Sequence, residues 1–144
     1  VIGLAAMNVA PEFGHKETEA LFELADLEKK FIPQERRSGL QEIMTRLSVD
    51  SLRWKKWMMG KNREASAEEI RRDKEASALI AQMCGHYTLN EEEVRAAIAT
   101  LYRNCGELGI DGRFYTIKKI KDSIDRYIYC FNLYGLTSAL RGIE

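Results

Sequence analysis

The chain of 144 residues lacks an excess of charge of either sign, because 22 lysines and arginines balance 22 aspartates and glutamates. This balance argues against binding to nucleic acid or to an anionic membrane surface, since both attract basic proteins. No apolar run reaches the roughly 18 residues that a transmembrane helix needs, and no basic segment precedes Val1 as in a signal peptide. We therefore expect a cytoplasmic protein that binds neither nucleic acid nor membrane.

Cysteine and histidine are also scarce, and their positions exclude several kinds of site. Cys84, Cys105 and Cys130 are odd in number, far apart and embedded in apolar helical patterns, which indicates reduced thiols in a core rather than a disulfide framework. His86 lies close to Cys84, but no second pair of ligands stands at the spacing of a closed zinc site. Neither His86 nor His15 has a nucleophile nearby, and a glycine-rich phosphate loop is missing as well.

Apolar residues are plentiful, at 45% of the chain, which is enough for a hydrophobic core. They are most concentrated in residues 1–10, an almost unbroken apolar run that leads to Pro11 and Gly14. Such a run indicates a buried strand of a parallel sheet, and the apolar spacing of residues 16–30 predicts a helix after it. A parallel strand needs neighbouring strands, and the rest of the sequence shows none. We therefore expect the chain to be part of a larger α/β protein.

The sequence after residue 15 has the periodicity of helices. Three expected helix N-termini carry a capping residue followed three positions later by Glu or Gln, at Ser38, Ser66 and Asn90. A short amphipathic helix is expected over residues 50–59 and a polar surface loop over residues 60–65. The pattern predicts a mainly α-helical chain with one N-terminal strand, whose further helices cover residues 40–47, 66–84, 90–105 and 116 onward.

Glu12 and His15 are the residues best placed for chemistry, since sites on parallel sheets lie at the carboxyl ends of the strands. In one interpretation, Glu12 caps the helix that begins near Lys16 and His15 is merely exposed. In the other, Asn8, Glu12 and His15 point into a pocket at the mouth of a barrel, with Asn8 contacting substrate. There Glu12 would act as a general acid/base or metal ligand, and His15 would bind a divalent metal such as zinc or an anionic substrate.

Trp54 and Trp57 stand in a compact aromatic and basic segment with Arg53, Lys55 and Lys56. In one interpretation, this segment is a short amphipathic helix whose tryptophans anchor it to the body of the protein. In the other, the two tryptophans belong to a surface that docks a partner or contacts phosphate, because large aromatic side chains beside basic groups are typical of interface hot spots.

Three stretches, taken in order, resemble the C-terminal portion of the tagatose-bisphosphate aldolase accessory-subunit family, which is the non-catalytic partner of a class II aldolase. The first is the Asn-Val-Ala-Pro-Glu-Phe-Gly sequence of residues 8–14 with the Glu-Ala-Leu-Phe-Glu-Leu sequence of residues 19–24. The second and most specific runs over residues 37–44 and on to the Trp-Lys-Lys-Trp motif of residues 54–57. The third, residues 90–105 and 116–134, is similar to the family in length and spacing.

This resemblance implies that the chain is the C-terminal part of a (β/α)8 protein of the TIM-barrel type followed by a helical extension. Residues 1–31 would hold a late barrel strand and its helix, and residues 32–144 the helical C-terminal region. The implied role is to stabilise the catalytic subunit of a class II aldolase that cleaves a ketose bisphosphate, within an oligomer. Some relatives in this family are ketose- or sugar-phosphate 4-epimerases that use a metal at the barrel mouth.

Three function hypotheses therefore stay open. The chain is an accessory aldolase subunit that docks through Trp54 and Trp57, or a metal-dependent sugar-phosphate epimerase or aldolase in which Glu12 and His15 carry the chemistry. Otherwise it is a helical protein-interaction module that has no connection with sugars.

Overall fold

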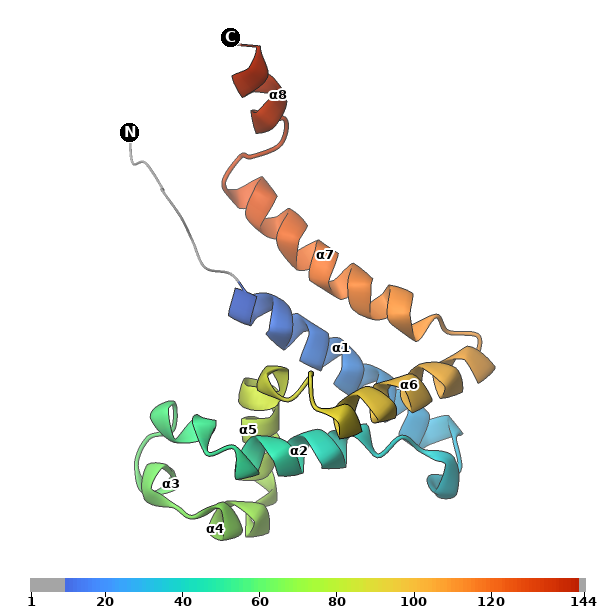
Figure 1. The fold of residues 1–144 in the computed structure, drawn as a ribbon, viewed down its shortest axis with the longest axis vertical. Coiled ribbons are helices and arrows are strands. Elements are labelled where there is room, and N and C mark those ends of the chain that lie inside the picture. The colour runs from blue at the N-terminus through green and yellow to red at the C-terminus, as the bar shows by residue number, and fades with distance from the viewer. Residues whose placement is uncertain (1–9, 143–144) are drawn as a thin grey trace.

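The computed structural model describes residues 10–142, and over this range the chain folds only into helices (Figure 1). They are α1 (Ala10–Phe31), α2 (Leu40–Asp50), α3 (Lys61–Glu64), α4 (Ala67–Arg72), α5 (Lys74–Cys84), α6 (Glu92–Glu107), α7 (Gly112–Cys130), α8 (Leu136–Arg141) and the 3₁₀ turns η1 (Gln34–Arg36), η2 (Arg53–Lys56) and η3 (Gly85–Tyr87). Helices α2 to α5 lie together at one end of the molecule, and α7 and α8 extend away from them.

The prediction of a barrel strand in a (β/α)8 protein is wrong, because no residue between 10 and 142 is in a strand and the helices pack on one another. Residues 1–9, which hold most of the predicted strand, lie outside the described residues. Where the sequence predicted a turn, Pro11 to His15 already form the first turns of α1. Proline is tolerated there because the first amide groups of a helix have no intrahelical partner, and the carboxylate of Glu12 suits the positive end of the helix dipole.

Gly14 serves close packing and not a turn. It lies inside α1, and a Cβ at this position would stand only 2.8 Å from the Cβ of His86. The glycine therefore allows α1 and η3 to approach each other closely.

Helix α1 is the central element of the larger hydrophobic core. Its buried Leu21, Leu24 and Ala25 belong to one cluster with apolar side chains of α2 and α6. Helix α7 lies antiparallel along α1 (Figure 1). Accordingly, Ser123 in the second half of α7 pairs with Glu12 near the start of α1. The core residues from α2 and α6 are Leu40, Met44, Val94, Ala97, Leu101 and Cys105.

A second cluster holds α2, α4, α5 and η2 together around Trp54, which is fully buried. The indole Nε1 of Trp54 donates a hydrogen bond of 2.8 Å to the carbonyl oxygen of Val49. Buried apolar residues from the surrounding helices complete the cluster, namely Val49, Met58, Ile70, Ala76, Ile80 and Cys84.

The helix boundaries follow the capping signals only in part. Ser66 and Glu69 form the predicted capping box, with the backbone and side chain of each bonded to the other. The predicted helix over residues 66–84 is divided at Asp73, whose carboxylate caps α5 by accepting a 2.9 Å hydrogen bond from the backbone of Ala76. Asn90 caps no helix, because α6 begins after Glu91. Short polar side chains compete for backbone groups wherever they stand, so sequence alone does not fix which one is used.

Ser38 is not the N-cap residue of α2, but its hydroxyl oxygen accepts a 3.3 Å hydrogen bond from the backbone amide of Leu40, the first residue of that helix. The N-cap of α2 is Gly39, and the backbone amide and the hydroxyl of Ser38 both donate to the carboxylate of Glu28, at 3.0 and 2.7 Å. The same carboxylate, only 2% exposed, accepts a 2.6 Å hydrogen bond from the side-chain amide of Asn104. Glu28 therefore ties the loop between α1 and α2 to α6.

The cysteines are free, and Cys84 and Cys105 are buried as predicted. Cys130 is exposed at the end of α7, so the prediction of a core position is wrong for this residue. Its apolar neighbours in the sequence are themselves largely exposed.

None of the helices in residues 10–142 combines the length and the apolar character needed to cross a membrane.

Candidate functional site

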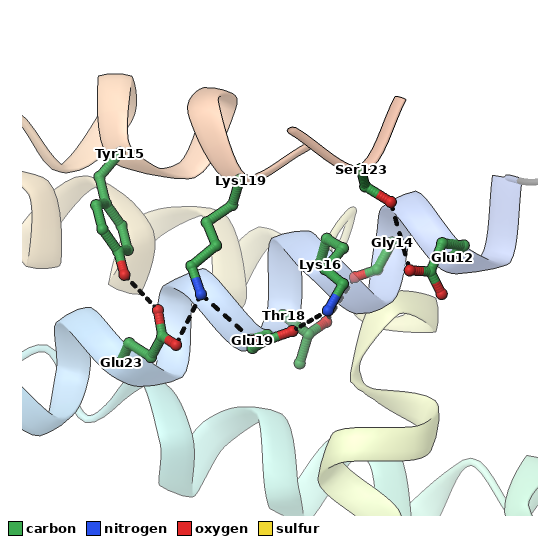
Figure 2. A network of polar contacts seen from close by, with 9 residues as sticks. All are labelled: Glu12, Gly14, Lys16, Thr18, Glu19, Glu23, Tyr115, Lys119 and Ser123. Carbon is green, nitrogen blue, oxygen red and sulfur yellow. Dashed lines mark hydrogen bonds and ion pairs between the residues drawn. The ribbon is translucent and has the colours of Figure 1, made fainter. Parts of the chain in front are cut away.

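The seam between α1 and α7 carries a chain of polar contacts (Figure 2). The ammonium group of Lys119 on α7 lies 2.8 Å from a carboxylate oxygen of Glu23 and 3.3 Å from one of Glu19, both on α1. Tyr115 donates a hydrogen bond to Glu23, and Lys16 forms a 2.6 Å ion pair with Glu19. The contacts of Lys119 and Tyr115 fix the register of α7 against α1, whereas the Lys16–Glu19 pair lies within α1.

The same contacts make Lys119 unsuited to act as a base. The hydrogen bond to Glu23, with further support from Glu19, holds the pKa of Lys119 well above its usual range. The pKa of Tyr115 is also raised, first because its hydroxyl donates to the Glu23 carboxylate. Both shifts favour the protonated side chains, which hold α7 against α1.

Glu12 and His15 lie one turn apart on α1 and line the same hollow of about 420 Å³. Glu12 accepts a long hydrogen bond of 3.4 Å from the hydroxyl of Ser123 on α7. A helix, and not the end of a strand, positions these two predicted residues at one hollow, and their predicted roles stay predictions. Asn8, the third residue expected here, lies outside the described residues.

A metal ion would need more ligands than these two side chains provide. Zinc sites in proteins take three or four protein ligands. Within residues 10–142, no three side chains of His, Cys, Asp or Glu lie together in an arrangement that could hold a metal ion. The donors Glu12 and His15 therefore do not by themselves fit the expected divalent metal.

His15 makes its main contact with a second histidine. The ring centroids of His15 and His86 are 4.7 Å apart, and the ring of His86 lies 3.9 Å from that of Tyr87. On the Tyr87 ring lie the guanidinium of Arg53, at 4.7 Å, and the ammonium of Lys56, at 5.9 Å. The neighbouring rings of His15, His86 and Tyr87, with the two basic side chains, connect the start of α1 with η2, which contains Trp54.

We expect the free energy of unfolding to depend on pH, because His86 lies among these rings. Burial, and then the neighbouring His15 and Arg53, lower the pKa of His86. Because the folded state disfavours the imidazolium, stability is complete above the usual histidine pKa of about 6.5 and is lost as the pH falls below it. We expect the free energy of unfolding to fall by at most about 1 kcal/mol between pH 7.5 and 5.5, since His86 is partly solvated.

Urea unfolding of the native chain and of the His86→Phe variant at the two pH values measures this effect. Phenylalanine keeps an aromatic ring against Tyr87 and does not titrate, so the variant should lose most of the pH dependence. Glu17, whose pKa is raised by burial, acts in the opposite direction and is present in both proteins. An equal pH dependence in the variant would show that His86 is not the group responsible.

The two tryptophans of the aromatic and basic segment have different surroundings. Trp54 is fully buried and hydrogen-bonded, as described above, whereas 57% of Trp57 is exposed. The interpretation of a core anchor is therefore correct for Trp54, and only Trp57 is available to a partner. The sequence could not distinguish the two tryptophans, because the burial of each depends on how η2 packs against α4 and α5.

Trp57 belongs to a surface that we name the Trp57 patch, formed by Leu52, Lys56, Trp57 and Met59. The three apolar side chains are 46%, 57% and 88% exposed in chain order, and the ammonium of Lys56 lies 5.0 Å from the Trp57 ring. Within the described part of the chain, Lys56 makes no ion pair. Leu52 also has a left-handed backbone with φ of 53°, which is unfavourable for a leucine and is tolerated mostly where the surroundings require it.

A further group of exposed apolar residues, between Tyr129 and Leu140, has no counterpart among the predicted sites. The sequence signal was present, since residues 127–140 contain no charged residue in a chain that is 31% charged.

Comparisons of the chain with protein-family models, with curated proteins and with solved structures give no match.

Proposed function

We propose that this chain is a helical protein-interaction module that docks through the Trp57 patch onto an acidic, partly apolar surface of another polypeptide. The observation that carries the proposal is the exposure of Trp57 beside Lys56, which makes no ion pair among residues 10–142, next to a turn that the buried Trp54 holds in place. Tryptophan on a rigid support loses little conformational freedom on binding, which is why such residues dominate interface energies.

Charge indicates the chemistry of the partner. Arg53, Lys55 and Lys56 follow one another around Trp54 within the segment and carry no acidic neighbour between them. A surface with this charge repels a second copy of itself and attracts carboxylates. The partner surface should therefore offer acidic groups around an apolar depression that accepts the indole ring.

The resemblance of the sequence to aldolase accessory subunits supports a specific partner, the catalytic subunit of a class II aldolase that cleaves tagatose bisphosphate. In this role the chain would stabilise the catalytic subunit and take no part in the chemistry. The alternative of a metal-dependent epimerase or aldolase stays a prediction from sequence. It has less support, because the described residues bring only Glu12 and His15 together.

The proposal predicts that Trp57→Ala weakens binding to the catalytic subunit by about 30-fold or more, the usual effect of truncating an interface hot spot. Isothermal titration measures the affinity, and the half-life of tagatose-bisphosphate cleavage with and without the chain measures stabilisation. The matched control is Phe114→Ala, which truncates another exposed aromatic residue, 64% exposed, outside the patch.

Both parts of the proposal would be supported if the native chain prolongs the half-life of the catalytic subunit, Trp57→Ala loses this effect and Phe114→Ala keeps it. Binding that is equally strong in all three proteins would contradict the role of the Trp57 patch. A catalytic subunit that neither binds the chain nor gains stability from it would contradict the partner.

A further inference from the structure

The end of α7, the turn that follows it and α8 carry a second group of exposed side chains, which we name the C-terminal face. It consists of Tyr129, Phe131, Leu133, Tyr134, Leu136 and Leu140. These six side chains are between 43% and 76% exposed, and no residue from 127 to 140 is charged. Large apolar side chains without charge are uncommon on the free surface of a monomer and are typical of the centre of an interface.

The C-terminal face is held in a defined shape. Asn132 has a left-handed backbone with φ of 53°, and the backbone amides of Asn132 and Leu133 donate to the carbonyl oxygens of Tyr129 and Ile128 at 3.0 and 2.9 Å. This is the Schellman motif, in which a left-handed residue ends a helix and reverses the chain. It ends α7, and a further backbone hydrogen bond of 3.2 Å, from the amide of Leu136 to the carbonyl oxygen of Leu133, leads into α8.

The place of the C-terminal face in the fold leaves it accessible. Figure 1 shows α8 beyond the end of α7, away from the helices α2 to α5. A second molecule can therefore approach it without contact between the two helical bodies.

We propose that the occupant of the C-terminal face is a second copy of this chain, so that the protein forms a dimer through α8 and the end of α7. Electrostatics favours this occupant, because an uncharged face repels no copy of itself and the whole chain has no net charge. The Trp57 patch differs in this respect, since its Lys56 and the neighbouring Arg53 and Lys55 oppose self-association.

The size of the C-terminal face also agrees with a dimer. From their exposed fractions, the six side chains offer on the order of 600 Å² of accessible surface, compared with about 800 Å² per partner in a stable interface. The remaining area would come from neighbouring residues of α7 and α8.

Sedimentation velocity of the full chain over a range of concentrations tests the dimer. The native chain should have twice the mass of one copy at micromolar concentrations. The double variant Leu133→Asp, Leu140→Asp should raise the dimer dissociation constant at least about 100-fold, because it places two carboxylates in the interface. The matched control is Leu79→Asp, on α5, whose leucine is 47% exposed. Circular dichroism confirms that each variant remains helical.

Alkylation of Cys130 identifies the occupant, because Cys84 and Cys105 are buried and react slowly. Protection of Cys130 that increases with protein concentration supports the second copy. Protection at every concentration in a monomer would mean that the chain covers its own face, and rapid alkylation of a monomer would mean an open face. Either result would overturn the proposal, as would a dimer that the double variant leaves unchanged.

Discussion

Replacing Trp54 by alanine is expected to lower the free energy of unfolding by about 3–5 kcal/mol, the range found for truncation of large aromatic residues in cores. Trp54 is fully buried, and its ring touches the cluster that unites α2, α4 and α5. The variant loses this packing and leaves the carbonyl oxygen of Val49 without its 2.8 Å hydrogen bond. Urea unfolding followed by circular dichroism measures the loss.

Two controls separate the causes. Trp54→Phe keeps most of the apolar volume and removes the hydrogen-bond donor, so it should cost clearly less than alanine. Trp57→Ala removes the exposed tryptophan of the same segment and should change stability by at most about 0.5 kcal/mol, as is usual for surface positions. Equal losses for Trp54→Ala and Trp57→Ala would contradict the division of the two tryptophans into an anchor and a docking residue.

Replacing Glu28 by alanine is expected to cost about 2–4 kcal/mol, because it leaves buried hydrogen-bond donors without an acceptor. The Glu28 carboxylate accepts from the backbone and hydroxyl of Ser38 and from the amide of Asn104. Both partners are held in place, Asn104 also by a 2.9 Å bond to the carbonyl oxygen of Arg36. Loss of the carboxylate should therefore loosen the loop between α1 and α2, which hydrogen exchange of the amide of Ser38 would detect.

Glu28→Gln distinguishes hydrogen bonding from charge. Glutamine retains one acceptor oxygen but places an amide group where a donor already points, so we expect roughly half of the loss seen with alanine. Glu35→Ala is the control for removing a glutamate in general, because Glu35 is exposed on η1. A loss in Glu35→Ala as large as that in Glu28→Ala would show that the buried network is not the cause.

Trp54 and Glu28 hold the two ends of α2. Glu28 fixes the loop before this helix through Ser38, and the second core cluster fixes Val49 near the end of α2 and with it the start of the Trp57 patch. Damage at either end should therefore weaken partner binding indirectly. Binding measured for Trp57→Ala is the cleaner test of docking, since that variant leaves both structural contacts intact.

Helical periodicity and local capping were predictable because they depend on residues close in the chain. The Ser66 and Glu69 capping box forms as expected, and the apolar spacing of residues 90–105 correctly predicted a helix that packs on the core. The error at the N-terminus had a local cause too. Pro11 and Gly14 resemble a turn in sequence, but Pro11 fits the start of a helix and Gly14 the close contact with His86.

The candidate site depended on contacts that no local pattern contains. Glu23 and Lys119 are 96 residues apart, and His15 meets His86 only because α1 and η3 pack together. Whether Leu133 and Leu140 close a core or stay exposed depended on the direction in which α7 leaves the body.

Composition and residue spacing alone indicate a mainly helical protein without net charge, in which Trp54 and Trp57 stand among Arg53, Lys55 and Lys56. Composition and hydrophobic periodicity carry this information, since they act within a few turns of helix. The packing of the helices shows that Trp54 is buried and Trp57 exposed, that Glu12 and His15 line one hollow, and that the uncharged apolar residues near the end of the chain are exposed. Burial is a property of packed helices, because the same apolar side chain is core or surface according to which helix covers it.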